Sequence, residues 1–156
     1  MMRGFTLIEM VVTVAIVGLL ASVAFPMAEL ASKRAREQEL HRALREIRDA
    51  LDAHRKAVEE GRIIQSLGQS GYPATLQALM DGVPDAASPD KKARIYLLRR
   101  IPRDPMCADA QVAEEATWGK RDYRSSADEP REGEQVFDVY SLASGTGLNG
   151  IPYRNW

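Results

Sequence analysis

The sequence of 156 residues contains few of the residue types on which catalytic and metal sites depend. A single cysteine, Cys107, excludes a disulfide within the chain and any site built from several cysteines. Two histidines, His41 and His54, leave little basis for a histidine-based zinc site or a catalytic triad. Aromatic residues make up only 6%, so the core is expected to be mainly aliphatic. A formal net charge of −1 excludes an acidic tail protein and a strongly basic nucleic-acid binder.

What the chain does have is one long apolar run near its N-terminus. Residues 5–25, FTLIEMVVTVAIVGLLASVAF, contain a single charged residue, Glu9. As a helix this run spans about 31 Å at about 1.5 Å per residue. The hydrocarbon core of a bilayer is about 30 Å thick. The segment is therefore just long enough to cross a membrane.

Three interpretations of this run are open. The first is a secretory signal peptide, with residues 22–24 imitating a cleavage site, although Arg3 is the only positive side chain before the run. The second is a plain membrane anchor, in which a charged Glu9 costs about 2.5 kcal/mol or more at mid-bilayer. The third gives Glu9 a function.

The third interpretation depends on the sequence RGFTLIE, residues 3–9, followed at once by the apolar run. This segment resembles the leader of type IV pilins and of the pseudopilins of type II secretion. The resemblance implies cleavage by a prepilin peptidase between Gly4 and Phe5, with N-methylation of Phe5. It also implies that Glu9 pairs with the new amino terminus of a neighbouring subunit and so aligns the incoming subunit. Two opposite charges buried together cost less than either alone. The alternative is that Glu9 merely lies near the membrane interface.

Beyond Pro26 the composition changes but the helical periodicity continues. From residue 29 to residue 62, half of the positions are charged. Apolar residues recur in steps of three and four, which places one stripe on a helix. The stripe consists of Leu40, Leu44, Ile47, Leu51 and Val58, with His54 in the remaining step.

We therefore expect one helix from Phe5 to about Glu60, with a membrane half (5–25) and an amphipathic half (26–60). The stripe is expected to pack on the chain's own C-terminal part, and a coiled coil is the alternative. Pro26 cannot donate a hydrogen bond to the preceding turn, so the helix is expected to kink there, with Gly18 as a second weak point.

The remaining part, residues 61–156, is rich in glycine and proline. Residues 73–80 (PATLQALM) predict a short helix with proline at its start and Gly82 just beyond its end. Residues 117–124 and 136–142 predict two strands, joined by a loop. The predicted fold class is α+β, with a small antiparallel sheet against the long helix. Cys107 is expected to be a half-buried thiol, and a cross-link to another subunit is the alternative.

Several motifs of this part narrow the resemblance. A YPATLQAL-like helix, then IPRDP, then WG, then DVYSL before a glycine-rich loop is similar to the major (G-type) pseudopilins of type II secretion. A pilin typically closes a C-terminal loop with two cysteines, whereas this chain has one. The resemblance implies a leader (1–4), a membrane helix half (5–25), an amphipathic half (26–60) and a periplasmic α+β domain (61–156).

Major pseudopilins typically bind calcium in the loop after the YSL strand. In this chain residues 143–150 contain no carboxylate, although calcium gains affinity from carboxylate ligands. The carbonyl groups of Leu142 and Ser144 and the side chain of Asn149 are the only weak candidate ligands. We therefore expect no cofactor, with calcium as the alternative.

The sequence thus predicts a structural subunit and not an enzyme. The resemblance implies assembly of many copies into a helical filament, the periplasmic pseudopilus. It also implies contacts with minor pseudopilins, the prepilin peptidase and an inner-membrane assembly platform, but not with nucleic acid. The expected location is the bacterial inner membrane, with a single span and a periplasmic C-terminal domain.

One charge pattern opposes this orientation. Lys33, Arg34 and Arg36 follow the span and only Arg3 precedes it, so the positive-inside rule places the C-terminal side in the cytoplasm.

Two other functions remain open. One is a type IV pilin or minor pilin for adhesion, motility or DNA uptake, and the other is a membrane-tethered periplasmic binding protein or enzyme.

Overall fold

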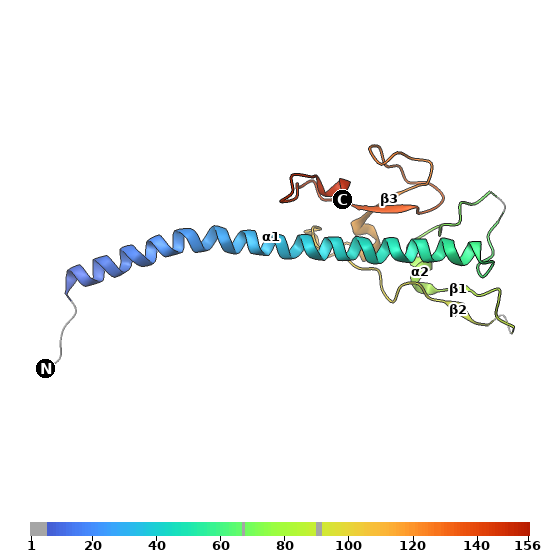
Figure 1. The fold of residues 1–156 in the computed structure, drawn as a ribbon, viewed down its shortest axis with the longest axis horizontal. Helices are drawn as coiled ribbons and strands as arrows, with labels where there is room; N and C mark the ends of the chain where they lie inside the picture. Colours follow the sequence, from blue (N-terminus) through green and yellow to red (C-terminus); the bar gives the residue numbers. More distant parts are fainter. Residues whose placement is uncertain (1–5, 67, 90–91) are drawn as a thin grey trace. The chain divides into compact units, whose positions relative to one another are not determined.

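The computed structural model describes residues 6–66, 68–89 and 92–156 of the chain (Figure 1). Its longest element is helix α1 (Leu7–Glu59), which is followed by a short helix α2 (Gln77–Asp81) and two small antiparallel sheets. The chain forms two compact units, Met1–Arg36 and Glu37–Trp156, and α1 contributes residues to both. The α+β class predicted from the sequence is confirmed.

Helix α1 ends where the sequence predicts. It stops at Glu59, and Gly61 follows with a φ angle of +71°, in the left-handed region that glycine adopts without strain. The N–H groups of Gly61 and Arg62 donate to the carbonyl groups of Val58 and Ala57, both at 2.9 Å. This pair of hydrogen bonds is a Schellman motif, which satisfies the last carbonyl groups of the helix.

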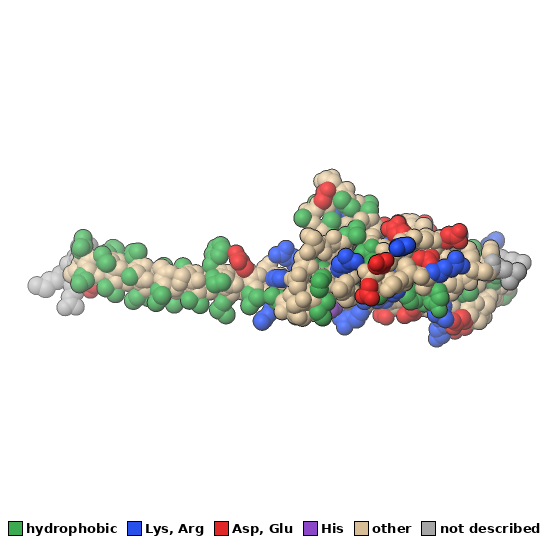
Figure 2. All heavy atoms as spheres, turned by 90° about the horizontal axis from the view of Figure 1, so that it is seen from above, with side chains coloured by type: hydrophobic (Ala, Val, Ile, Leu, Met, Phe, Trp, Pro, Cys, Tyr) green, Lys and Arg blue, Asp and Glu red, His purple; other side chains and the backbone are tan. Residues whose placement is uncertain are grey.

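The first half of α1 is apolar and exposed over its whole circumference. Among the described helices, α1 is the one that is long and apolar enough to span a membrane, and none of its apolar window is buried in the structure. Figure 2 shows hydrophobic side chains along this half and almost no charge. The hydroxyl groups of Thr13 and Ser22 donate to carbonyl groups of the preceding turn, at 2.7 Å in each case, so neither needs water.

Pro26 lies inside α1, and the helix continues through it. The missing N–H of a proline removes one hydrogen bond but does not by itself end a helix. The predicted kinks at Gly18 and Pro26 stay predictions.

The second half of α1 buries one face in the core of the second unit. The buried positions recur in steps of three and four, as predicted: Leu40, Ala43, Leu44, Ile47, Ala50, Leu51, His54 and Ala57. Those from Leu40 to Leu51 pack with Leu76, Leu79, Leu98, Ile101, Trp118 and Val139 from the rest of the unit. Each fully buried leucine or isoleucine contributes about 1.5–3 kcal/mol of transfer free energy. The stripe therefore packs on its own chain, although Ala57 and not Val58 is its last buried residue.

The two predicted strands exist but are shorter than predicted. Strand β3 (Trp118–Arg121) pairs antiparallel with β4 (Asp138–Ser141), with Trp118 opposite Ser141. β3 ends early because Asp122 starts a turn: its carboxylate accepts from the N–H of Arg124 at 2.8 Å, and its carbonyl accepts from that of Ser125. Side-chain hydrogen bonds of this kind draw the backbone out of a strand.

Three motifs of the sequence meet around β3 and β4. The indole N–H of Trp118 donates to the carbonyl of Pro102 at 2.7 Å. The buried carboxylate of Asp104 accepts from the hydroxyl of Ser141 at 2.6 Å. A Cβ on Gly119 would overlap the ring of Tyr140, so the WG motif requires glycine at its second position. The motifs therefore fix the packing of the sheet on the segment that precedes it.

The region between α1 and β3 departs more from the prediction. Helix α2 begins at Gln77, four residues after the predicted start. The carbonyl of Pro73 accepts from the N–H of Val136 at 2.8 Å, so this residue is bound to the segment before β4 and not to a helical turn. The hairpin of β1 (Val83–Pro84) and β2 (Arg94–Ile95) was not predicted. Two η (3-10) turns, η1 (Glu114–Thr117) and η2 (Tyr153–Asn155), complete the described elements.

Candidate functional site

The N-terminal motif begins outside the described residues. Gly4 and Phe5, the predicted cleavage and methylation positions, lie in the part of the chain that the structure does not describe. The described chain starts at Thr6, one residue before α1.

Glu9 closes the first turn of α1. Its Oε2 atom accepts from the backbone N–H of Thr6 at 2.8 Å and from the Thr6 hydroxyl at 2.7 Å. In return, the Glu9 N–H donates to Oγ1 of Thr6 at 3.3 Å. This reciprocal arrangement is a capping box, which satisfies N–H groups that a helix start otherwise leaves free. Our sequence reasoning missed Thr6, although its spacing of three residues from Glu9 is the usual signal for a capping box.

The capping box leaves part of the Glu9 carboxylate available. Among the described residues, no hydrogen bond uses Oε1, and the side chain is exposed. A negative charge is favoured at a helix N-terminus, where the unpaired N–H groups carry partial positive charge. The carboxylate is thus held at the beginning of an apolar helix with one oxygen open to a cation from outside the chain.

The exposed apolar surface of α1 surrounds this carboxylate. Large hydrophobic side chains face solvent on every side of the helix: Leu7, Ile8, Met10, Val11, Val12, Val14, Ile16, Val17, Leu19, Leu20, Val23, Phe25, Met27 and Leu30. A contiguous patch of this size marks a protein or membrane interaction surface, because soluble monomers rarely expose one.

The loop after β4 contains the weak calcium candidates of the sequence, and several of its oxygens accept backbone N–H groups. The side-chain oxygen of Asn149 accepts from the N–H of Ile151 at 3.0 Å. The carbonyl of Gly147 accepts from Gly150, and that of Gly145 accepts from Tyr153. Within the described ranges, no group of three or more His, Cys, Asp or Glu side chains is placed to hold a metal ion.

Leu142 and Ser144 face a different part of the surface. Together with Asp128 and Glu129 they line a groove of about 430 Å³, which also contains Arg131 and Arg154. Arg131 pairs with Glu129 at 3.3 Å, so guanidinium groups, and not an open cation position, accompany these carboxylates. Asn149 does not line this groove, so the three predicted ligands do not share it.

Sequence reasoning also missed the residues that fasten this loop. Glu37 accepts hydrogen bonds from the N–H of Leu148 and the hydroxyl of Tyr153, and His41 stacks on Trp156. About two turns beyond His41 on α1, Arg48 contacts Asp138 of β4 at 2.8 Å. These residues lie far apart in the sequence, and no local pattern connects them.

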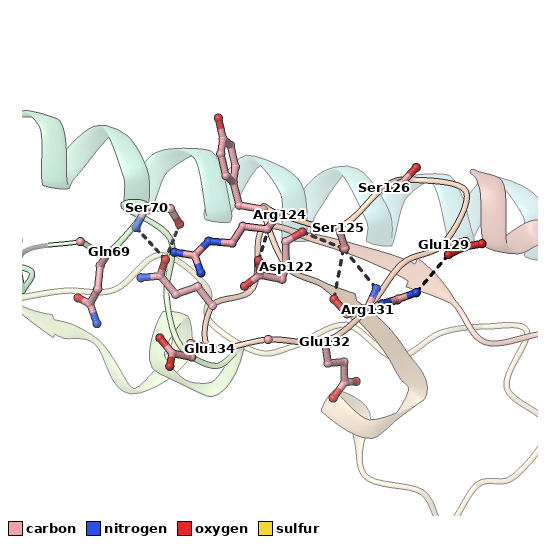
Figure 3. Close-up of a pocket in the computed structure, with 14 residues that line it drawn as sticks. Gln69, Ser70, Asp122, Arg124, Ser125, Ser126, Glu129, Arg131, Glu132 and Glu134 are labelled. Carbon is pink, nitrogen blue, oxygen red and sulfur yellow. Dashed lines mark hydrogen bonds and ion pairs between the residues drawn. The ribbon is translucent and has the colours of Figure 1, made fainter.

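A second surface recess, of about 480 Å³, lies between the segment 68–70 and the segment 122–135 (Figure 3). Its lining carries charges of both signs, including Asp122, Arg124, Glu129, Arg131 and Glu134. In Figure 3 some of these groups bind one another, as Arg131 does Glu129, and the recess contains neither histidine nor cysteine. None of the described residues that line it belongs to a group of three or more His, Cys, Asp or Glu side chains placed to hold a metal ion.

Cys107 is half-buried. Its sulfur lies 3.7 Å from the carbonyl oxygen of Asp109 and 3.9 Å from a guanidinium nitrogen of Arg103. This agrees with the expected half-buried thiol, and a cross-link to another subunit stays untested.

Comparison with known proteins identifies relatives along the whole chain. Residues 1–25 match the model of the prokaryotic N-terminal methylation motif. The chain is 32% identical to the type II secretion system core protein G of Klebsiella pneumoniae, over 98% of this chain and 89% of that protein. It is 31% identical to the proteins of the same name from Klebsiella michiganensis, over 80% and 82%, and from Dickeya chrysanthemi, over 77% and 73%. No solved structure matches the chain at a significant level.

Proposed function

The chain belongs to the family of the type II secretion system core protein G, and from this membership we propose its function in detail. It is a pseudopilin: a structural subunit that a prepilin peptidase processes and that is assembled into the pseudopilus of type II protein secretion. The observation that carries this function is the similarity over nearly the whole chain together with the methylation motif at residues 1–25. We assign it no catalytic reaction.

Processing after Gly4, with methylation of Phe5, agrees with the start of α1. The helix begins at Leu7, so the new amino terminus lies two residues before the first helical turn. Its positive charge is then next to the apolar surface of the same helix, where an isolated charge is costly. A carboxylate partner removes most of that cost only if it lies close by.

Glu9 is the carboxylate that we propose as this partner, acting between subunits. In its own chain Glu9 uses Oε2 for the capping box with Thr6, and no hydrogen bond within the described part of the chain uses Oε1. The amino terminus of a neighbouring copy supplies the cation, so the pairing fixes the axial position of one helix against the next.

The apolar half of α1 has two successive environments in this proposal. Before assembly it is a membrane anchor in the inner membrane, which its length and composition fit. After assembly the same surface packs against the α1 helices of other copies in a helical filament. We place the second unit in the periplasm and propose minor pseudopilins, the prepilin peptidase and an inner-membrane platform as further partners.

The first experiment measures the intact mass of the protein purified from membranes, with and without a prepilin peptidase. We expect a species that begins at methylated Phe5 when the peptidase is present, and the unprocessed chain when it is absent. A species that begins at Met1 or Phe25 in both cases contradicts the proposal.

A second experiment separates processing from assembly. Glu9→Ala is expected to be cleaved normally but to lose filament formation and secretion, because the neighbouring amine has no partner. Glu29→Ala removes an exposed carboxylate further along α1 and is expected to change neither. Unchanged filaments and secretion in Glu9→Ala would overturn the role of Glu9, whatever the mass experiment shows.

A further inference from the structure

The glycine-rich loop after β4 is held against α1 by one buried carboxylate. Oε1 of Glu37 accepts from the backbone N–H of Leu148 at 2.9 Å and from the hydroxyl of Tyr153 at 2.9 Å. Glu37 is 8% exposed and Tyr153 is 5% exposed, so the hydrogen bond between their side chains is shielded from water, whereas that from Leu148 is only partly buried. We call Glu37, Leu148 and Tyr153 the Glu37 latch.

One helical turn further along α1, an aromatic contact continues the latch. The ring of His41 stacks on that of Trp156, with centroids 4.2 Å apart and planes inclined by 13°. Trp156 in turn contacts the ring of Tyr153 edge-on, at 5.1 Å. A side chain at position 147 would overlap Trp156, so Gly147 permits this close approach. The loop is therefore clamped between a carboxylate and a stacked ring.

The loop directs hydrogen-bond donors toward α1, and a cation would repel these donors. Leu148 presents an N–H, and Tyr153 an O–H, toward the carboxylate of Glu37. A bound cation needs oxygen lone pairs directed at one point. In this loop the side chain of Asn149 and the carbonyl groups of Gly145 and Gly147 accept backbone N–H groups instead.

We propose that the Glu37 latch takes the place of a divalent cation in fixing the C-terminal loop of this subunit. The loop keeps its conformation because a buried negative charge on α1 receives two donors from it. The fold of the loop is then independent of calcium. This inference follows from the second unit alone and does not depend on the proposed function.

The test is hydrogen–deuterium exchange of the full chain in detergent, read by mass spectrometry on peptides that cover residues 142–156. The exchange rate of the loop is expected to be the same in millimolar calcium chloride and in a chelator. Glu37→Ala is expected to accelerate exchange in the loop about tenfold or more, the factor that follows from losing a hydrogen bond to a charged group.

Two further variants make the test specific. Glu37→Gln keeps an acceptor oxygen without the charge, so its acceleration is expected to be smaller than that of Glu37→Ala. Glu39→Ala removes an exposed carboxylate two residues away and is expected to leave the loop unchanged. Peptides from β3 and β4 report whether the unit as a whole stays folded.

If Glu37→Ala unfolds the whole unit, Tyr153→Phe decides the question, because it removes a single donor and keeps the ring. It is then expected to accelerate exchange in the loop alone. Slower exchange of the wild-type loop in calcium overturns the proposal. So does unchanged loop exchange in Glu37→Ala, or in Tyr153→Phe where that variant is needed. These exchange rates do not depend on processing or assembly. A result that contradicts the Glu37 latch therefore leaves the proposed function untouched, and the reverse is also true.

Discussion

At the scale of single residues, His54 links stability to pH. It is 3% exposed, and its Nδ1 atom lies 2.8 Å from the carbonyl oxygen of Gly71. Because a carbonyl only accepts, Nδ1 carries the hydrogen. Burial lowers the pKa of His54 below its ordinary 6.5, and the Gly71 carbonyl offsets part of that effect.

The sign of the pH effect follows from this lowered pKa. Below about pH 6.5 the unfolded chain binds a proton at His54 that the folded chain does not bind until a lower pH. We therefore expect the free energy of unfolding to fall as the pH drops below 6.5. Urea unfolding at a series of pH values measures it. His54→Asn is expected to be less stable but to lose this part of the pH dependence, whereas His41→Asn keeps it. A slope that His54→Asn leaves intact would assign the effect to other groups.

At the scale of elements, Arg48 joins α1 to β4 and to the end of the chain. Its Nε donates to the carboxylate of Asp138 at 2.8 Å, and its Nη2 donates to the carbonyl groups of Val139 and Trp156 at 3.2 and 2.7 Å. Arg121 of β3 binds the other oxygen of Asp138 at 3.1 Å. One guanidinium thus fixes the helix to the strand with two hydrogen bonds and to Trp156 with a third.

A lysine cannot reproduce this planar set of donors. We expect Arg48→Lys to lower the free energy of unfolding by about 1–2 kcal/mol, since two or more hydrogen bonds are weakened. Arg45→Lys, at an exposed position one turn earlier, is expected to change stability by less than about 0.5 kcal/mol. Thermal unfolding of both variants measures the difference. Equal midpoints for the two variants would show that the contact does not stabilise the packing of α1 on β4.

The elements also show how far the sequence alone can predict this fold. The helix and its buried stripe were predictable because the period of Leu40, Leu44, Ile47 and Leu51 extends over several turns. The hairpin of β1 and β2 was not, since strands of two residues have no periodicity. The partners of Glu37 lie more than a hundred residues away, at Leu148 and Tyr153. Contacts of this kind depend on the folded arrangement and leave no local pattern. For Glu9 the motif predicted a function, but its local role in capping α1 was missed.

At the scale of the whole molecule, the core and the assembly surface occupy different parts of the sequence. Every residue of the hydrophobic core cluster lies between Leu40 and Trp156. The large apolar residues from Leu7 to Leu30 are all exposed and belong to the first compact unit. Removal of the first apolar turns therefore takes no buried side chain from the second unit.

A fragment that begins at Glu29 tests this division of roles. We expect it to be a soluble monomer in size-exclusion chromatography with light scattering, because the large apolar surface that drives association is absent. Its thermal midpoint is expected to lie within a few degrees of that of the full chain in detergent, since the whole core is kept. The fragment is also expected to retain the pH dependence from His54 and to form no filaments. A fragment that fails to fold would show that the first half of α1 stabilises the second unit. A fragment that still forms filaments would place the assembly surface on the second unit, because the carboxylate of Glu9 and most of the apolar helix would then be dispensable.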